Sequence, residues 1–248
     1  MRYQGSKAKI AKHFLPIITK HLNGDNFYFE PFMGGCNVID KVDYKNKVGL
    51  DNNRYVVDMW NAFKHGQLPP KEVSKEEYER LKQIAKSPSY STDDMSWLIG
   101  YVGNACSYGS SWFNGYAHFN KAKKENHILE AYNGTVKQIE RFKHLGSTLF
   151  IHSDYSEYKH YPPSSVIYCD PPYQSTKGYK SDFDHESFWE WVRKMSQEGH
   201  YVYVSEYNAP SDFKCVWEME RPDGMGTTVK GRKQTKKIEK LFIYDGKR

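Results

Sequence analysis

The strongest constraint on the fold is a pair of apolar runs joined by a glycine-rich turn near the start of the chain. Residues 27–29 are aromatic and lead directly into Glu30-Pro31-Phe32-Met33-Gly34-Gly35. Residues 48–50 form a second apolar run, which ends at Asp51, and a helix is expected between the turn and about Lys41. This order of strand, glycine loop, helix, strand and acid predicts the first β–α–β unit of a doubly wound α/β sheet.

The remaining apolar runs continue this pattern. Amphipathic helices are expected over 10–22 and 188–195, and strands at 148–151, 166–169, 201–205 and 241–244. Residues 57–143 differ, because they are polar, rich in lysine and aromatic side chains, and mostly helical in spacing. We predict one α/β domain formed by residues 1–56 and 144–248, with residues 57–143 inserted as a mostly helical subdomain. The basic segment 221–240 is expected to be a loop or hairpin.

Composition narrows the class of protein. The chain has 248 residues and a formal net charge of +6, which is compatible with a polyanionic partner. Its four cysteines include no Cys-x-x-Cys pair, so a disulfide framework and a zinc ribbon are both disfavoured. The sequence has no apolar signal core, and no apolar run approaches the roughly 20 residues that span a bilayer. We expect a cytoplasmic protein that uses neither a metal nor a membrane.

The tetrapeptide Asp170-Pro171-Pro172-Tyr173 directly follows the predicted strand 166–169. Tandem prolines have fixed φ angles and no N–H donors, so the turn that carries the acid is stiff. A stiff turn suits chemistry on the exocyclic amine of a base, which is a poor nucleophile because its lone pair is delocalised. The Asp170 carboxylate and the Pro171 carbonyl can accept the two amine hydrogens, and Tyr173 offers a face on which a flipped base can stack. The alternative interpretation is an ordinary strand end with a proline turn.

Three motifs resemble one enzyme family, in the same order along the chain. The tetrapeptide resembles the catalytic motif of amino-methyltransferases that use S-adenosylmethionine (SAM), adenine-specific ones above all. Tyr3-Gln4-Gly5-Ser6-Lys7 is similar to the motif that opens the Dam-type adenine DNA methyltransferases, and residues 30–35 are similar to their SAM loop. The resemblance implies a SAM-methyltransferase Rossmann-like sheet of about seven strands. It also implies methyl transfer to the exocyclic amine of adenine in double-stranded DNA, with S-adenosylhomocysteine as product and residues 57–143 as the DNA-recognition region.

The cofactor site is expected at the glycine turn. Gly34 and Gly35 let the backbone approach a ligand where a side chain would clash. Asp51, just past the second strand, is placed to accept hydrogen bonds from ribose hydroxyls, although a solvated turn acid would have the same position in sequence. The amino-acid pattern therefore predicts a nucleoside-binding turn between residues 30 and 51.

The family resemblance adds further cofactor residues. It implies that Tyr3 packs near SAM and that Lys7 pairs with the carboxylate of SAM. The alternative for Lys7 is that it is simply one of many basic residues on the surface of a helix. It also implies that Asp154 and Tyr155 hold the adenine of SAM. The complete expected set is Tyr3, Gly5, Lys7, Glu30, Phe32, Gly34, Gly35, Asp51, Asp154, Tyr155 and Asp170.

An aromatic run at 108–116 is the candidate DNA contact. Its aromatic and small polar residues, with the lysines that follow, suit groove and phosphate contacts, and an aromatic cluster that closes a small core is the alternative. No arginine lies between Arg80 and Arg141. Because arginine commonly reads guanine, GATC is not favoured as the target, and the pattern looks closer to phage-type orphan members. The basic tail would either grip phosphates or form a solvated hairpin. The predicted DNA contacts are Tyr108, Ser110, Ser111, Trp112, Asn114, Lys121, Lys123, Lys124, Lys230 and Arg232.

Three other functions stay open on the sequence. Methylation of the cytosine amine uses the same chemistry, but its enzymes more often have serine in place of Asp170. Enzymes that methylate a protein glutamine usually have asparagine at the position of Asp170. A DNA-binding protein that keeps the fold without catalysis is the third, and the intact tetrapeptide and glycine loop argue against it. The chain is expected to act as a monomer or weak dimer.

Overall fold

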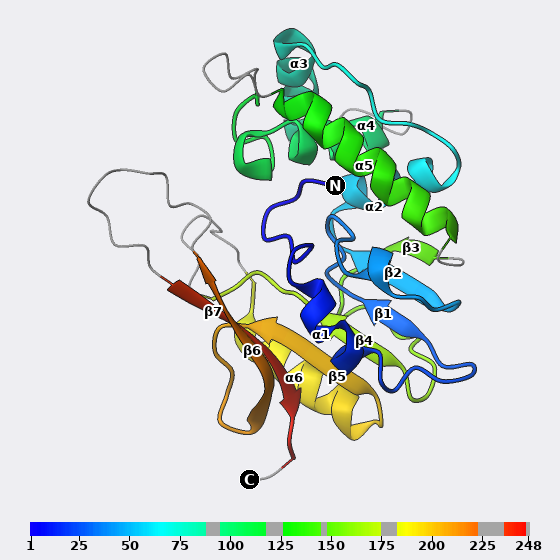
Figure 1. Cartoon of the computed structure of the whole chain (residues 1–248), viewed down its shortest axis with the longest axis vertical. Coiled ribbons are helices and arrows are strands. Elements are labelled where there is room, and N and C mark those ends of the chain that lie inside the picture. Colours follow the sequence, from blue (N-terminus) through cyan, green and yellow to red (C-terminus); the bar gives the residue numbers. More distant parts are fainter. Residues whose placement is uncertain (88–94, 118–125, 145–147, 175–182, 223–235, 247–248) are drawn as a thin grey trace.

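The core of the protein is a seven-stranded sheet with the strand order β3-β2-β1-β4-β5-β7-β6 (Figure 1). The computed structural model describes residues 1–87, 95–117, 126–144, 148–174, 183–222 and 236–246. The first five strands pair in parallel, and β7 is antiparallel to both β5 and β6. The predicted α/β class and strand number are therefore confirmed. The strands are β1 Tyr28–Glu30, β2 Lys47–Asp51, β3 Thr148–His152, β4 Val166–Cys169, β5 Tyr201–Glu206, β6 Phe213–Pro222 and β7 Lys236–Tyr244.

Alternating side chains on the strands create two buried layers, one on each face of the sheet. In β4, Val166 and Tyr168 join one hydrophobic cluster, while Ile167 and Cys169 join the other. This is the two-residue period of a strand. Helices α1 (Ala11–Ile18) and α2 (Arg54–Lys64) cover the first face, and α6 (His185–Gln197) covers the second. The sheet is thus buried on both faces, as a parallel sheet requires.

The predicted insertion forms a group of helices at one end of the molecule, opposite the β6–β7 hairpin (Figure 1). Its elements are α3 (Lys75–Lys86), α4 (Ser96–Ala105), the 3₁₀ turn η2 (Tyr108–Ser110) and α5 (His127–His144). The expected boundary at residue 56 falls inside α2, which contacts β3 and α4. Buried residues of these helices and of the sheet share one hydrophobic cluster. The division into two domains stays a prediction.

One expectation about secondary structure was wrong. The helix expected after the glycine turn is absent, and only the 3₁₀ turn η1 (Ile39–Lys41) forms. The cause is the backbone, because Gly34 (φ 41°) and Cys36 (φ 52°) both adopt the left-handed region, which no α-helix can include. The basic segment 221–240 begins and ends in strand, since β6 and β7 extend into it and pair as an antiparallel hairpin, one of the two forms expected. Their charged alternation is typical of an edge hairpin and hides the strands from a search for apolar runs.

The part of the chain that the structure describes includes no helix that is both long and apolar enough to cross a lipid bilayer.

Close packing of α4 on α2 gives a test of the fold. A Cβ atom at Gly100 of α4 would lie 2.1 Å from the carbonyl oxygen of Tyr55. We expect Gly100→Ala to lower the free energy of unfolding by about 1–3 kcal/mol, because the two helix backbones must separate to admit the methyl group. Urea denaturation measures the change. Gly134→Ala in α5 is the matched control, since nothing lies within 4 Å of its added Cβ, and we expect it to be neutral or mildly stabilising. Equal destabilisation by both substitutions would contradict the packing argument.

Candidate active site

A cavity of about 490 Å³ opens at the carboxyl ends of β1 and β4. These strands are neighbours in the sheet, although more than a hundred residues separate them in sequence. The strand order reverses between them, which is where ligands bind in open α/β sheets. Every predicted catalytic and cofactor residue lies in the cavity wall: Tyr3, Gly5, Lys7, Glu30, Phe32, Gly34, Gly35, Asp51, Asp154, Tyr155, Asp170, Pro171, Pro172 and Tyr173.

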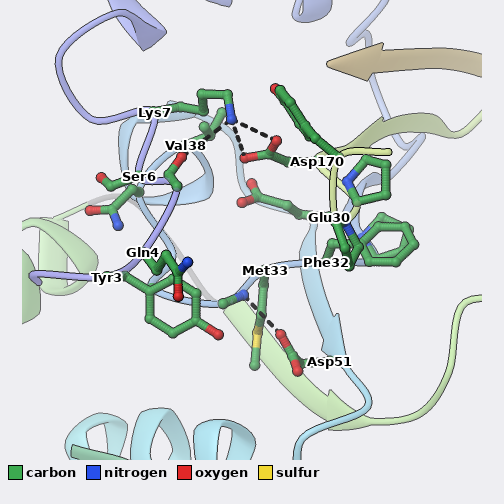
Figure 2. Close-up of a pocket in the computed structure, with 18 of the residues that line it drawn as sticks. Tyr3, Gln4, Ser6, Lys7, Glu30, Phe32, Met33, Val38, Asp51 and Asp170 are labelled. Atoms are coloured by element: carbon green, nitrogen blue, oxygen red, sulfur yellow. Dashed lines mark hydrogen bonds and ion pairs between the residues drawn. The ribbon is translucent and has the colours of Figure 1, made fainter. Parts of the chain in front are cut away.

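Asp170, which follows β4, forms an ion pair with Lys7 (Figure 2). Lys7 Nζ donates to Oδ1 at 2.7 Å and to Oδ2 at 3.0 Å, and also to the carbonyl oxygen of Gly5 at 3.2 Å. The lysine side chain is 4% exposed and the carboxylate 20%. Burial raises the pKa of Asp170, and the Lys7 cation opposes that rise. The pair therefore joins the N-terminal segment to the proline turn and favours an ionised acid at the cavity wall.

The ring of Tyr173 is held from two sides. Its hydroxyl donates to Glu239 Oε2 on β7 at 2.9 Å, and Tyr207 packs edge-on against it with ring centres 4.7 Å apart. Lys7 Nζ lies 4.6 Å from the ring centre. Burial raises the pKa of Tyr173 well above its ordinary value, so the hydroxyl stays protonated and can keep donating. The ring is consequently fixed in one orientation beside Asp170.

Sequence reasoning missed two carboxylates that support this wall. Glu239 lies in the segment expected to be a loop or hairpin, and no local pattern links it to Tyr173. Glu206, at the end of β5, accepts hydrogen bonds from the backbone nitrogens of Tyr207 (2.7 Å) and Gln174 (3.2 Å). Burial raises the pKa of Glu206 to about 7. Its position directly after a predicted strand was the available signal.

The glycine turn is shaped by the packing of Tyr3. A Cβ at Gly34 would lie 2.5 Å from Cε1 of the Tyr3 ring, and a Cβ at Gly35 would lie 2.5 Å from the Tyr3 Cβ. We expected these glycines to let the backbone approach a ligand. In the structure, the space that a side chain would need at both positions is occupied by Tyr3. Trp60 Nε1 donates to the Gly34 carbonyl at 3.0 Å and holds the turn from α2.

Two acids sit at the far end of the same wall. Asp51 accepts from the backbone nitrogens of Gly34 through Oδ2 and Asn53 through Oδ1, both at 2.9 Å. Burial raises the pKa of Asp51 to about 6 in spite of these hydrogen bonds. Asp154 Oδ1 accepts from the backbone nitrogen of Ser156 at 2.9 Å and from its hydroxyl at 2.6 Å. Each carboxylate oxygen has two lone pairs, so both acids keep capacity for a ligand.

The wall of the cavity is acidic. It holds two lysines, Lys7 and Lys237, and a larger set of acids that comprises Glu30, Asp51, Asp154, Asp170 and Glu239. Glu30 is 2% exposed, and burial raises its pKa well above the ordinary value although Tyr28 donates a hydrogen bond to it. This charge balance favours a ligand that carries positive charge. Within the described ranges, no group of three or more His, Cys, Asp or Glu is arranged to hold a metal ion.

The aromatic run at 108–116 is partly core and partly surface. Phe113 is 6% exposed and packs on Tyr78, as the core alternative predicted. Trp112 lies in the cavity wall, where it stacks on Tyr55, and Tyr108 is 69% exposed. Among the other predicted DNA contacts, Asn114 is exposed, Ser111 is half-buried and Ser110 is buried. Lys121, Lys123, Lys124, Lys230 and Arg232 lie outside the described residues.

Comparison with known proteins was made by family, by sequence and by structure. A family model of the D12 class N6 adenine-specific DNA methyltransferases matches residues 3–218. The Retron Ec67 DNA adenine methylase of Escherichia coli is 25% identical over 224 residues, which cover 83% of this chain and 75% of that protein. Two structures of the rRNA methyltransferase AviRa from Streptomyces viridochromogenes align with TM-scores of 0.44 and 0.46 at 8% and 9% identity. The alignments cover 98% of this chain and 86% and 87% of those chains.

The Lys7–Asp170 pair predicts a pH-dependent defect. Without the cation, the largest influence that offsets burial is lost, and the pKa of Asp170 rises further. A carboxyl whose folded pKa exceeds its unfolded value stabilises the fold at low pH, and it loses that contribution as pH rises through the folded pKa. We therefore expect Lys7→Met to lower the free energy of unfolding by on the order of 1–3 kcal/mol near pH 8, and by less near pH 5. Urea denaturation at both pH values measures this difference.

The control is the double variant Lys7→Met/Asp170→Asn. The double variant has no ionisable group at this position. The difference between its free energy of unfolding and that of the single variant Asp170→Asn should therefore be the same at both pH values. Destabilisation by Lys7→Met that does not change with pH would contradict the assignment.

Proposed function

Because the chain belongs to the D12 class N6 adenine-specific DNA methyltransferase family, we propose that the cavity between β1 and β4 is where the methyl group of SAM is transferred to the exocyclic amine of adenine in DNA. The protein is thus a SAM-dependent adenine DNA methyltransferase, and the acceptor base is adenine rather than cytosine. The observation that carries the assignment of the site is the Asp170 carboxylate, which shares one cavity with the glycine turn and Asp51.

The cavity fits SAM in size and in charge. Its volume of about 490 Å³ lies in the range of small-molecule sites, and its acids outnumber its lysines. When bound, SAM supplies an electrophilic methyl group on a positively charged sulfonium. We assign Asp51 to the ribose hydroxyls, Asp154 and Tyr155 to the adenine, and Lys7 to the carboxylate. The three N–H donors of Lys7 serve Asp170 and the Gly5 carbonyl in the structure, so Lys7 would bind that carboxylate with the donor it now gives to Gly5 and keep its pair with Asp170.

The residues of the tetrapeptide would activate the amine. The Asp170 carboxylate and the Pro171 carbonyl accept its two hydrogens, which localises the nitrogen lone pair for attack. Lys7 favours the ionised carboxylate that this role requires. Pro171 and Pro172 keep both acceptors in a stiff turn, and stiffness matters because attack must be nearly in line.

Tyr173 is the stacking surface for the flipped adenine in this proposal. A base leaves the duplex at a cost of a few kcal/mol, and stacking on an aromatic face offsets part of that cost. Glu239 and Tyr207 fix the ring before any base arrives, so little side-chain entropy is lost on binding. We regard Glu239 as a positioning residue that acts through the Tyr173 hydroxyl.

The helical end of the molecule is the proposed DNA-recognition region. Trp112 at the cavity wall and the exposed Tyr108 are suitably placed to contact DNA around the flipped base. We propose that the protein acts in the cytoplasm, as a monomer or weak dimer, on double-stranded DNA at a site other than GATC. Sequencing of methylated plasmid DNA identifies that site.

The catalytic assignment is tested with labelled SAM and DNA. The wild-type protein should place the label in N6-methyladenine, identified after digestion to nucleosides. We expect Asp170→Ala to lower the rate of transfer by at least about 100-fold, because an electrostatic contact to the reacting amine is lost, while SAM binding stays measurable. Label in cytosine, or near-normal methylation by the variant, would refute the mechanism.

The assignment of Asp51 predicts a pH dependence of SAM affinity. Its pKa is raised to about 6 by burial, and the ionised form accepts hydroxyl donors more strongly than the protonated form. SAM affinity should therefore increase as pH rises through about 6. Asp51→Asn should bind SAM about 10-fold more weakly above that pH and lose this part of the dependence. Isothermal titration calorimetry between pH 5 and pH 8 measures it, and an unchanged profile in Asp51→Asn would exclude the role.

A further inference from the structure

The glycine turn has an unusual backbone that needs support. Gly34 and Cys36 both have left-handed φ angles, of 41° and 52°. Glycine adopts this region freely, but a residue with a side chain does so at a cost. Cys36 is fully buried, and its backbone nitrogen donates to the Met33 carbonyl at 2.7 Å. The Cys36 carbonyl accepts from the Asp40 nitrogen only at 3.4 Å, so this segment needs a closer donor for that carbonyl and a donor for the Gly35 carbonyl.

One side chain supplies both donors. Gln138 on α5 is fully buried, and its Nε2 donates to the Gly35 carbonyl at 2.9 Å and to the Cys36 carbonyl at 2.7 Å. Its Oε1 accepts from the nitrogen of Met1. Because the oxygen takes a donor, the orientation of the amide is fixed and both N–H groups must face the turn. The contact joins residues 103 positions apart in the chain.

A second contact one helical turn away strengthens this arrangement. Arg141 Nε donates to Asp40 Oδ2 at 2.9 Å, and Asp40 is fully buried in η1, just after the turn. Residues three apart on a helix share a face. Gln138 and Arg141 therefore hold the beginning and the end of the segment 35–40 against one face of α5.

We propose that Gln138 is a positioning residue for SAM, which sets the backbone of the glycine turn in the conformation that lines the cavity. The proposal rests on the proposed function, since it takes the ligand of the cavity to be SAM. If the amide is removed, the Gly35 carbonyl loses its donor, the Cys36 carbonyl keeps only the long hydrogen bond from Asp40, and the left-handed turn can relax. The turn carries Gly34, whose nitrogen holds Asp51, so relaxation disturbs the nucleoside end of the cavity as well.

The test uses Gln138→Met, which keeps the bulk of the side chain and removes both donors. We expect calorimetry to show SAM binding at least about 10-fold weaker, with the KM for SAM raised to match. The kcat at saturating SAM and the KM for DNA should stay within about twofold of wild type, because the side-chain contacts described for Asp170 and Tyr173 are with Lys7, Glu239 and Tyr207, which lie outside α5. If Gln138 had only a general structural role, its substitution would not raise the KM for SAM while leaving kcat and the KM for DNA unchanged.

Two variants on the same helix are the controls. Thr135→Val removes a buried hydrogen bond, from Thr135 Oγ1 to the Ala131 carbonyl (2.8 Å), that does not reach the turn. It should leave SAM affinity unchanged and have only a small effect on the melting temperature, because the Ala131 carbonyl keeps its helical N–H donor. Lys137→Met introduces the same new side chain at an exposed position and should change neither property. If Gln138→Met does not fold, Gln138→Glu replaces it, since a carboxyl group keeps an acceptor for the Met1 nitrogen and supplies at most one donor to the two carbonyls.

The outcomes separate this inference from the proposed function. Wild-type SAM affinity in Gln138→Met, or an equal loss in Thr135→Val, overturns the role of Gln138. A wild-type protein that binds SAM but does not methylate DNA refutes the proposed activity and still allows the affinity comparison. A wild-type protein that binds no SAM overturns both.

Discussion

The ion pair between Lys7 and Asp170 is the interaction on which the cavity depends. Parallel strands end at one edge of the sheet, so β1 and β4 bring the carboxyl groups of Glu30 and Asp170 to the same cavity wall. Burial and the nearby charge of Asp170 raise the pKa of Glu30, whereas the Lys7 cation opposes the effect of burial on Asp170 and favours its ionised form. Lys7 supplies the cation only when the N-terminal segment crosses the cavity. That path in turn places Tyr3 against the glycine turn. Because Tyr3 fills the space there, no side chain larger than hydrogen fits at Gly34 or Gly35.

The antiparallel end of the sheet supports the opposite wall. Without β7, Tyr173 would lose the acceptor of its hydroxyl, and without the chain after β5 it would lose the ring of Tyr207. The hairpin that follows the parallel core therefore acts on the site through one aromatic ring. Glycine turn, proline turn and hairpin each contribute a rigid backbone, and the side chains between them have few alternative orientations. A preorganised site of this kind loses little entropy when a ligand binds.

Much of this arrangement could be predicted from local sequence patterns. Buried parallel strands have apolar runs, which located β2, β3 and β4. The motif residues could be assigned to one site because the carboxyl ends of parallel strands meet. Other features had no local pattern. The hydrogen bonds of Gln138 and Glu239 join residues that are 103 and 66 positions apart in the sequence. In β6, charged residues alternate with apolar ones, a pattern that resembles a loop. The helix expected after Gly35 failed because two left-handed residues override helical spacing.

The place of β7 between β5 and β6 has a consequence for the synthesis of the protein. β6 leaves the ribosome before β7, yet the structure has no pairing between β5 and β6 for the nascent chain to use. Until residues 236–244 emerge, the growing chain presents β5 with an open edge, the kind of edge that recruits strands from other molecules. The same late segment carries Glu239. Completion of the sheet and completion of the wall around Tyr173 are therefore a single event, which follows the synthesis of residues 236–244.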